Sequence, residues 1–242
     1  MHIIWLEHMC PDKNPRFRIA TKGDREGRML KWYNAADSPE CKWGEYQPHS
    51  SIHTMSEKIR IFVAIEIPAN IKNGLGLLIK SLSESSGDAR IRWVKPGSIH
   101  LTLKFIGDVA HGSVSKVTEN LETIVSKRSK FKIRVGGLGC FPNWNKPRVV
   151  WVGISEDSGE LTNLQKEIDL ALEPLGIMSE TRPFHAHLTV ARVKNPGDIG
   201  KRFSEMEIGV LGQVQVDEFC LIRSDLRSDG AVYTNLATFE LQ

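Results

Sequence analysis

The tetrapeptide His-Leu-Thr-Leu at residues 100–103 returns 87 positions later (187 minus 100) as His-Leu-Thr-Val at residues 187–190. Each copy lies in an apolar, alternating segment that is typical of a half-buried strand. Because side chains two positions apart share one face of a strand, each copy sets a histidine and a threonine about 6.6 Å apart on one face. The intervening apolar residues turn toward a core. Two such strands predict a duplicated fold that brings His100 and His187 together from different halves.

Strands and helices alternate along the rest of the chain, and twice the order is strand, helix, motif strand. This order predicts a duplicated α+β unit whose two sheets face each other across a cleft. Composition and periodicity predict strands at residues 59–67, 91–94, 98–105, 131–135, 148–154, 185–193, 214–223 and 233–241, and helices at 70–82, 114–125, 161–175 and, as a short one, 199–206.

Residues 1–54 differ from the remainder of the chain. They lack sustained periodicity, are dense in Pro, Gly, Asp, Asn and charge, and hold three of the six tryptophans. Their histidines and cysteines match the spacing of no zinc module. We therefore predict an N-terminal extension at residues 1–54, poorly ordered or not native to the protein, and one domain at residues 55–242.

Composition narrows the class of protein. The formal charge of +3 does not indicate a broad basic surface for nonspecific nucleic-acid binding, although a small basic cleft is compatible with it. No apolar run approaches the roughly 18 residues of a membrane span, and the first residues make a poor signal peptide. Four widely spaced cysteines indicate no disulfide framework. We expect a cytoplasmic protein without a membrane partner.

Two histidines and two threonine hydroxyls, without clustered carboxylates or thiols, suit displacement at phosphorus. The attacking and leaving oxygens lie roughly in line, so the reaction needs a base on one side and an acid on the other. An imidazole with a pKa near ~6.5 can serve as either at neutral pH. The hydroxyls of Thr102 and Thr189 can donate to the nonbridging phosphoryl oxygens. We expect neither a metal nor a cofactor. Lys104 would add positive charge on the same face if its strand is regular; otherwise it is a solvated lysine.

Residues 92–107 and 182–192 resemble the two signature blocks of the 2H phosphoesterase superfamily, and within it the RNA 2′,3′-cyclic phosphodiesterases, also called 2′-5′ RNA ligase-like proteins. The resemblance covers residues 58–241, nearly everything beyond the extension. It implies two mainly antiparallel sheets facing a central cleft, with helices on the outside. Ala186 stands where the family usually has proline, a departure that affects backbone stiffness rather than chemistry. Supporting blocks are residues 141–142, 147–153, 223–224, Gly230 and Tyr233.

The resemblance implies metal-free hydrolysis of a terminal 2′,3′-cyclic phosphate on RNA to a 2′-phosphomonoester. In that reaction His100 is the acid that protonates the departing 3′ oxygen, and His187 is the base that activates water. Thr102 and Thr189 bind the phosphate. The substrate is then an RNA 3′ end or a small cyclic nucleotide, and the protein is expected to act as a monomer.

Three further side chains are candidate substrate contacts. Arg148 and Arg192 are candidates for phosphate or RNA-backbone contacts, against the alternative that they are ordinary surface or ion-pairing residues. Trp144 is a candidate for stacking on a base, against the alternative that it packs on its own loop.

Other functions remain open at this point. The same four groups would serve a 2′-5′ RNA ligase, a 2′-5′ phosphodiesterase or an enzyme that opens small cyclic nucleotides. A noncatalytic RNA-end binding module would retain the cleft without needing an acid and a base. A structural protein with two incidental histidines would show no pH-dependent activity.

Overall fold

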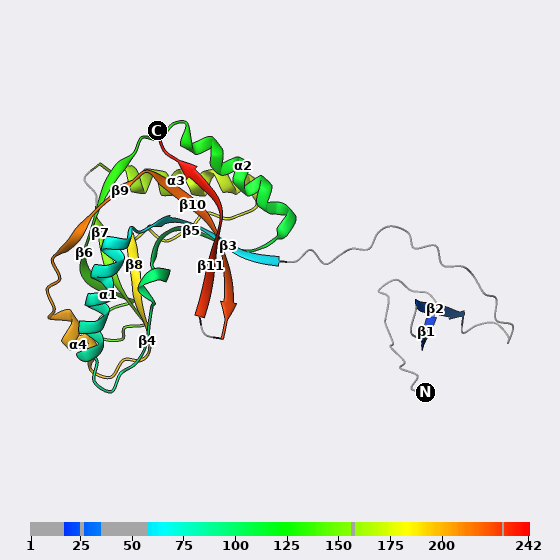
Figure 1. Ribbon diagram of the computed structural model, residues 1–242, viewed down its shortest axis with the longest axis horizontal. Coiled ribbons are helices and arrows are strands. Elements are labelled where there is room, and N and C mark those ends of the chain that lie inside the picture. Colours follow the sequence, from blue (N-terminus) through cyan, green and yellow to red (C-terminus); the bar gives the residue numbers. More distant parts are fainter. Residues whose placement is uncertain (1–16, 25–26, 35–57, 156–157, 229) are drawn as a thin grey trace. The chain divides into compact units, whose positions relative to one another are not determined.

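The structure is a computed structural model that describes residues 17–24, 27–34, 58–155, 158–228 and 230–242. The chain divides into two compact units, Met1–Thr54 and Met55–Gln242. Within the first, strands β1 (Phe17–Asp24) and β2 (Gly27–Asn34) form an antiparallel hairpin where the sequence indicated no element. All other helices and strands of the described residues belong to the second unit (Figure 1).

The second unit contains two fully antiparallel sheets. The first has the strand order β11-β10-β3-β5 and the second the order β4-β8-β7-β6-β9. The strands of the first sheet are β3 (Lys58–Glu66), β5 (His100–Ala110), β10 (Glu218–Arg227) and β11 (Gly230–Glu240). Those of the second are β4 (Arg90–Trp93), β6 (Phe131–Phe141), β7 (Val149–Ser155), β8 (His187–Asn195) and β9 (Val210–Val216).

Each half repeats one pattern, in which the strand before a helix pairs with the motif strand after it. β3 pairs with β5 around helix α1, and β7 pairs with β8 around helix α3. The predicted duplicated α+β fold is therefore confirmed. The helices are α1 (Ala69–Glu84), α2 (Val114–Val125), α3 (Glu160–Leu172) and α4 (Ile199–Ser204), with 3-10 turns at Pro96–Ser98, His111–Ser113 and Glu173–Leu175.

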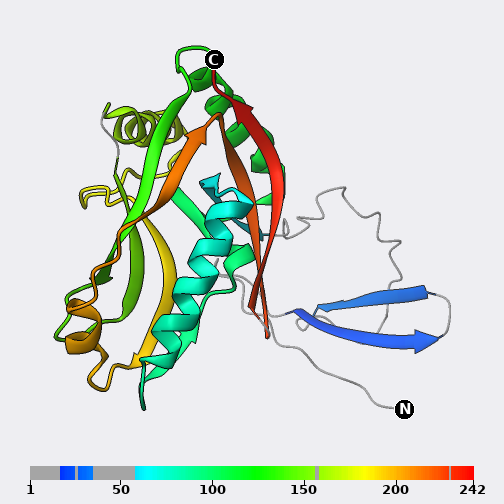
Figure 2. The same ribbon diagram turned by 60° about the vertical axis from the view of Figure 1, so that its left-hand side comes forward.

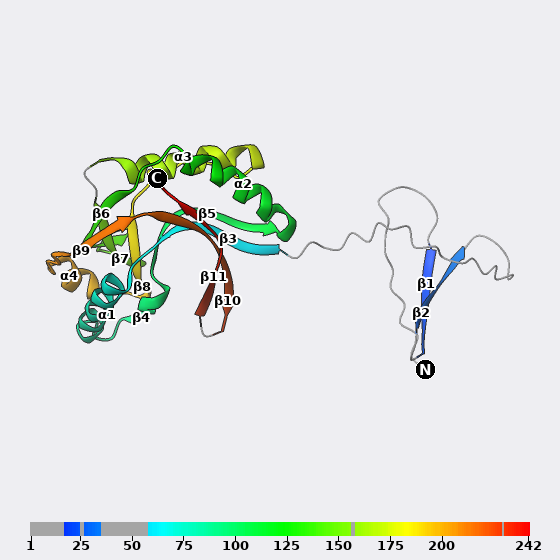
Figure 3. The same ribbon diagram turned by 45° about the horizontal axis from the view of Figure 1, so that its top comes forward.

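The helices lie outside the sheets. α2 and α3 pack against each other, and α3 also contacts β5 and β6 (Figure 3). α1 lies along the other side of the unit and contacts β9 (Figure 2). Apolar residues at helical spacing form the buried stripe of each helix, because side chains three and four positions apart share one face. No helix in the described part of the chain is long and apolar enough to cross a bilayer.

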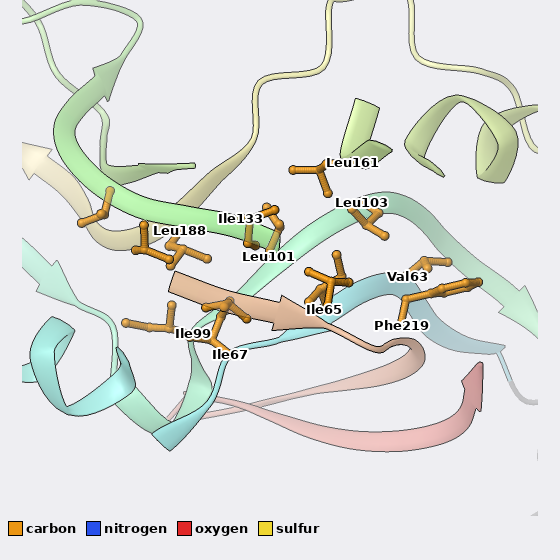
Figure 4. Close-up of a cluster of buried hydrophobic side chains, with 14 of the residues drawn as sticks. Val63, Ile65, Ile67, Ile99, Leu101, Leu103, Ile133, Leu161, Leu188 and Phe219 are labelled. Atoms are coloured by element: carbon orange, nitrogen blue, oxygen red, sulfur yellow. The ribbon is translucent and has the colours of Figure 1, made fainter. Parts of the chain in front are cut away.

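The apolar residues between the motif positions form the centre of the core. Leu101 and Leu103 of β5 and Leu188 and Val190 of β8 are buried, as predicted from the alternation. Figure 4 shows Leu101 and Leu188 in one cluster to which both sheets contribute. β5 and β8 thus pack through one face, which leaves the histidine-bearing face of each strand free for other contacts.

The prediction of a single strand at residues 214–223 is wrong. The chain leaves the second sheet at the end of β9 and joins the first sheet as β10, with only Asp217 between them. The Asp217 carbonyl accepts a hydrogen bond from the Leu241 N–H (2.7 Å). Alternation of apolar and polar residues indicates a half-buried strand but not the sheet to which the strand belongs. The sequence pattern therefore does not reveal that the chain changes sheets at Asp217.

The predicted strand at residues 131–135 is longer in the structure and continues to Phe141 as β6. Gly136 and Gly137 interrupt its apolar pattern, yet pairing with β7 resumes at Leu138 after an irregularity in register. Gly137 has φ +74°, a conformation that glycine adopts without steric cost. The two glycines therefore mark a β-bulge inside one strand rather than its end.

Candidate active site

The first motif strand carries a β-bulge immediately after its threonine. Thr102 pairs with Ala64 of β3, and the next pairing along the strands joins Lys104 to Val63. Leu103 is therefore the extra residue and has no partner of its own. A bulge of this kind reverses the alternation of the strand beyond it. His100 and Thr102 keep a common face, and the residues after them change faces.

The second motif strand repeats this irregularity at the corresponding position. Thr189 pairs with Trp151 of β7, and the next pairing joins Ala191 to Val150, so Val190 is the extra residue. The two halves therefore share a backbone irregularity as well as a sequence motif. A common device that re-aims side chains directly beside the paired histidines and threonines is typical of an active site.

The bulge removes Lys104 from the site, which corrects the expectation based on a regular strand. Lys104 shares the core face with its partner Val63 and is buried. Its ammonium lies 2.6 Å from a carboxylate oxygen of Asp169 in α3 and donates a hydrogen bond of 2.6 Å to the Met178 carbonyl. Lys104 therefore neutralises a buried carboxylate on the core face of the strand rather than lying on the face of His100 and Thr102.

The same bulges bring two other residues to the site face, each five positions after a motif histidine. Phe105 pairs with Phe62 of β3, and the centroids of the two rings lie 6.0 Å apart. Arg192 occupies the corresponding position in β8 and is exposed. Regular alternation would have turned both residues toward the core. The predicted contact Arg192 thus lies on the same face as His187.

Both imidazoles are held by the same hydrogen bond. Nδ1 of His100 lies 3.1 Å from the Ser98 carbonyl oxygen, and Nδ1 of His187 lies 2.7 Å from the His185 carbonyl oxygen. Because a carbonyl oxygen can only accept, each Nδ1 carries a hydrogen in this bond. The other ring nitrogen, Nε2, is then the atom left to exchange a proton with a ligand.

The ring of His100 is fixed by aromatic neighbours. It stacks on Phe62 with a centroid separation of 4.7 Å and an interplanar angle of 30°. The ring of Tyr233 in β11 also contacts the His100 imidazole, edge to face, with a centroid separation of 4.9 Å. These contacts lie within the range of favourable aromatic packing and hold the imidazole in one orientation.

Charged neighbours act on His100 in opposite directions. Burial lowers its pKa, while the carboxylate of Glu66, its cross-strand partner, opposes that fall. Lys72 of α1 forms an ion pair with Glu66 at 3.0 Å and itself lowers the pKa of His100. The Lys72 ammonium also donates to the Gly97 carbonyl at 3.2 Å, which anchors it near the motif.

His187 has no carboxylate in the corresponding place, because its cross-strand partner is Gly153. Burial lowers its pKa, and electrostatic interactions with His185 and Arg192 lower it further, against the hydrogen bond to the His185 carbonyl. Phe141 meets its ring edge-on at 5.1 Å. Within the described part of the chain, no carboxylate therefore opposes the fall in the pKa of His187, whereas Glu66 opposes the fall in the pKa of His100.

Trp151 supports the second half of the site. Its ring centroid lies 4.7 Å from that of His185 and 6.2 Å from that of His187. It covers Gly139 of the neighbouring strand, where a Cβ atom would clash with the indole. Only glycine leaves the ring this space. Beside it lies a cavity of about 280 Å³, lined by Trp151, Gly153, Ile154, Leu161, Thr162, Phe184, His185 and Ala186.

Arg192 and Tyr233 connect the two halves of the site. Arg192 lowers the pKa of His187 and opposes the rise that burial causes in the pKa of Tyr233. Tyr233 in turn contacts the ring of His100. His187 and Tyr233, which contacts the ring of His100, are therefore both within electrostatic reach of Arg192, and Thr102 and Thr189 lie on the same strand faces as the histidines.

Two predicted contacts lie elsewhere. Trp144 packs against the hydrophobic core, and its carbonyl oxygen lies so close to Gly200 of α4 that a Cβ atom there would clash with it. Trp144 therefore packs against the core rather than on its own loop, and its stacking on a base stays a prediction. Arg148 is exposed, and strand alternation puts it on the face of Val150, away from Trp151.

The aromatic and charged surroundings of the histidines were not predicted from the sequence. Tyr233 and Phe141 stood in the supporting blocks of the resemblance but were assigned no role. Glu66 and Trp151 lie directly opposite motif residues, a position that only the register reveals. Among the described residues, no group of three or more His, Cys, Asp or Glu side chains is placed to hold a metal ion.

Comparisons with known proteins match both halves. A family model described as LigT like Phosphoesterase matches residues 65–151 and again residues 152–233. A protein of Archaeoglobus fulgidus named RNA 2′,3′-cyclic phosphodiesterase is 37% identical over 186 residues, which are 75% of this chain and all of that protein. One of the same name from Methanothermobacter thermautotrophicus is 32% identical over 187 residues, 76% of this chain and all of that protein.

Solved structures share the fold. A Thermus thermophilus protein, TT0787, superimposes with a TM-score of 0.64 at 27% identity, covering 76% of this chain and 98% of that one. Escherichia coli LigT, crystallised with 3′-AMP, superimposes with a TM-score of 0.63 at 25% identity, covering 77% of this chain and 99% of that one. With the family model matched once in each half, around each motif strand, this chain belongs to the LigT-like phosphoesterase family.

Proposed function

We propose that the protein is an RNA 2′,3′-cyclic phosphodiesterase that converts a terminal 2′,3′-cyclic phosphate to a 2′-phosphomonoester without a metal ion. The observation that carries the proposal is the pair of motif strands, which present two imidazoles with the same tautomer beside two threonines. The names of the similar proteins supply the substrate.

In the proposed reaction, neutral His187 takes a proton from water through Nε2 as the water oxygen attacks phosphorus. The bond between phosphorus and the 3′ oxygen breaks, and protonated His100 gives its Nε2 proton to that oxygen. The 2′ ester bond remains, so the product carries a 2′-phosphate and a 3′-hydroxyl. Glu66 beside His100 favours the acid role, and Arg192 and His185 beside His187 favour the base role.

The other polar groups of the site bind the phosphate. Thr102 and Thr189 share strand faces with the histidines, so their hydroxyls can donate to the two nonbridging oxygens. Arg192 supplies positive charge on the same face, where it balances the charge that develops on the phosphorane-like transition state. The monomeric state and the cytoplasmic location of the protein stay predictions.

The test is the reaction itself on a short RNA that ends in a 2′,3′-cyclic phosphate. We expect a 2′-phosphate, identified by ³¹P NMR and by its response to a 3′-specific phosphatase, at a rate that EDTA leaves unchanged. A 3′-phosphate product, or activity lost with EDTA and restored by a divalent ion, would contradict the proposed mechanism. Joined ends would favour the ligase, and binding without turnover would favour the RNA-end binding module.

Glu66→Gln is expected to shift the alkaline limb of the pH–rate profile to lower pH and so to narrow the profile. The carboxylate raises the pKa of His100, so its removal lowers that pKa and the acid loses its proton at a lower pH. Lys72→Met should move the same limb to higher pH, because Lys72 lowers the pKa of His100. Imidazole titration by NMR measures both shifts independently of turnover. Shifts of one sign in both variants would argue against the assignment.

A chain that begins at Met55 is expected to fold and to keep full activity. The two motif strands, both sheets and the core all lie within Met55–Gln242. Thermal unfolding and the cyclic-phosphate assay, each compared with the full chain, check this. A shortened chain without a cooperative transition would show that residues 1–54 are integral and would overturn the proposed domain boundary.

A further inference from the structure

Two arginines lie directly opposite each other at the edge of the second sheet. Arg92 of β4 is the cross-strand partner of Arg192 of β8, so both point to the site face, and both are exposed. Directly opposed residues in an antiparallel pair have Cβ atoms about 4.5–5.5 Å apart, and like charges at that spacing destabilise the pair. Across the described residues, neither guanidinium forms an ion pair or a hydrogen bond with another side chain.

The pair lies at the site rather than on a remote surface. Arg192 is close enough to His187 and Tyr233 to influence the pKa of each. The guanidinium of Arg92 reaches the first residue of β11, where a Cβ atom on Gly230 would lie 3.8 Å from it. Tyr233, three residues further along β11, contacts His100. Arg92 therefore extends the positive charge of the site from the second sheet toward the β10–β11 hairpin of the first.

We infer that Arg92, beside Arg192, forms a second phosphate site, which holds the phosphodiester that joins the terminal nucleotide to the rest of the RNA. This rests on the proposed function, in which Arg192 faces the reacting phosphate. One anion leaves a pair of opposed guanidiniums only partly neutralised, whereas two neighbouring phosphates of one strand supply one partner for each. The preferred substrate is then an oligonucleotide of at least two residues, not a mononucleotide.

The test compares two substrates with the same reacting end, a nucleoside 2′,3′-cyclic phosphate and a dinucleotide that ends in one. The wild-type protein should prefer the dinucleotide in kcat/KM. Arg92→Gln should lower that preference about 10- to 100-fold, the range for losing one charge-assisted hydrogen bond. It should also reduce the dependence of dinucleotide binding on salt concentration, because one phosphate contact is lost.

Lys166→Gln is the matched control, since it removes the same charge from an exposed position on α3, the helix that packs on the core side of β5. It should leave the preference for the dinucleotide unchanged. Equal loss on both substrates in Arg92→Gln, or no loss on either, would overturn the second phosphate site while leaving the proposed function intact.

A binding measurement distinguishes failure of the second phosphate site from failure of the proposed reaction. If neither cyclic phosphate is hydrolysed, the proposed function fails, and the second site is decided by titrating the protein with a dinucleotide 2′-phosphate and a nucleoside 2′-phosphate. Weaker binding of the dinucleotide alone in Arg92→Gln supports the site. Equal affinities for the two ligands in the wild-type protein contradict it.

Discussion

Replacing His100 or His187 by alanine is expected to lower turnover of an RNA 2′,3′-cyclic phosphate by about 10² to 10⁴, the range for a positioned proton transfer. Each imidazole offers Nε2 while its Nδ1 is fixed on a backbone carbonyl, so its removal takes away a positioned proton donor or acceptor. Substrate binding should be largely retained, because the hydroxyls of Thr102 and Thr189 remain. Single-turnover rates and a separate binding measurement distinguish the two effects.

Four further variants test the assignment of the two histidines. The double variant should be little worse than either single one, because acid and base act as a unit. Thr102→Ala and Thr189→Ala should weaken binding and rate together while leaving the bell shape of the pH profile, which reports the histidine pair. His111→Ala, at an exposed histidine outside the site, is the control and should behave as wild type. Near-normal turnover in either motif variant would remove that histidine from the mechanism.

The sequence was informative wherever a side-chain period decides the structure. The helix at residues 114–125 was predicted to the residue, because three buried side chains mark its core stripe and polar residues fill the rest. The motif strands followed from strict alternation, and their duplication indicated the two sheets. These features are local, and the hydrophobic effect selects them in the same way in any globular context.

What the sequence could not predict depends on register. A β-bulge needs only one extra residue, and Leu103 and Val190 fit an alternating strand as well as a bulged one. The consequence is large, because a slip of one residue exchanges the faces of everything beyond it. This is why Lys104 was expected in the site and lies in the core. It is also why Arg192, an odd number of positions from His187, shares its face.

The residues that shift the pKa values of the histidines could not be predicted from the local sequence pattern for the same reason. Glu66 ends a strand that begins more than 30 residues before His100 and looks like a solvated charge at its edge. Only the pairing of β3 with β5 places it opposite the imidazole. Trp144, by contrast, is a candidate because it is an aromatic residue in a loop, but it is partly buried and packs against the core without a ligand.

The buried ion pair that the bulge creates leads to the largest expected change in stability. Lys104 has a side chain that is 2% exposed, and its partner Asp169 is 11% exposed, with its other oxygen accepting a hydrogen bond of 2.8 Å from Gln165. Asp169→Ala leaves the ammonium buried with only the Met178 carbonyl as a partner. Losing one member of such a pair costs about 3–5 kcal/mol, because the remaining charge is desolvated without compensation.

Urea unfolding of the chain measures this loss of stability, and two further variants test whether it comes from the buried charge. Asp108→Ala breaks an ion pair of similar length with Arg60, but both side chains are about half exposed (50% and 52%), so water solvates the remaining charge and the midpoint should hardly move. The double variant Lys104→Met, Asp169→Leu should recover most of the lost stability, since apolar side chains of similar size fill the space without a buried charge. If Asp169→Ala is as mild as Asp108→Ala, water reaches Lys104, and the bulge is held by backbone pairing rather than by this ion pair.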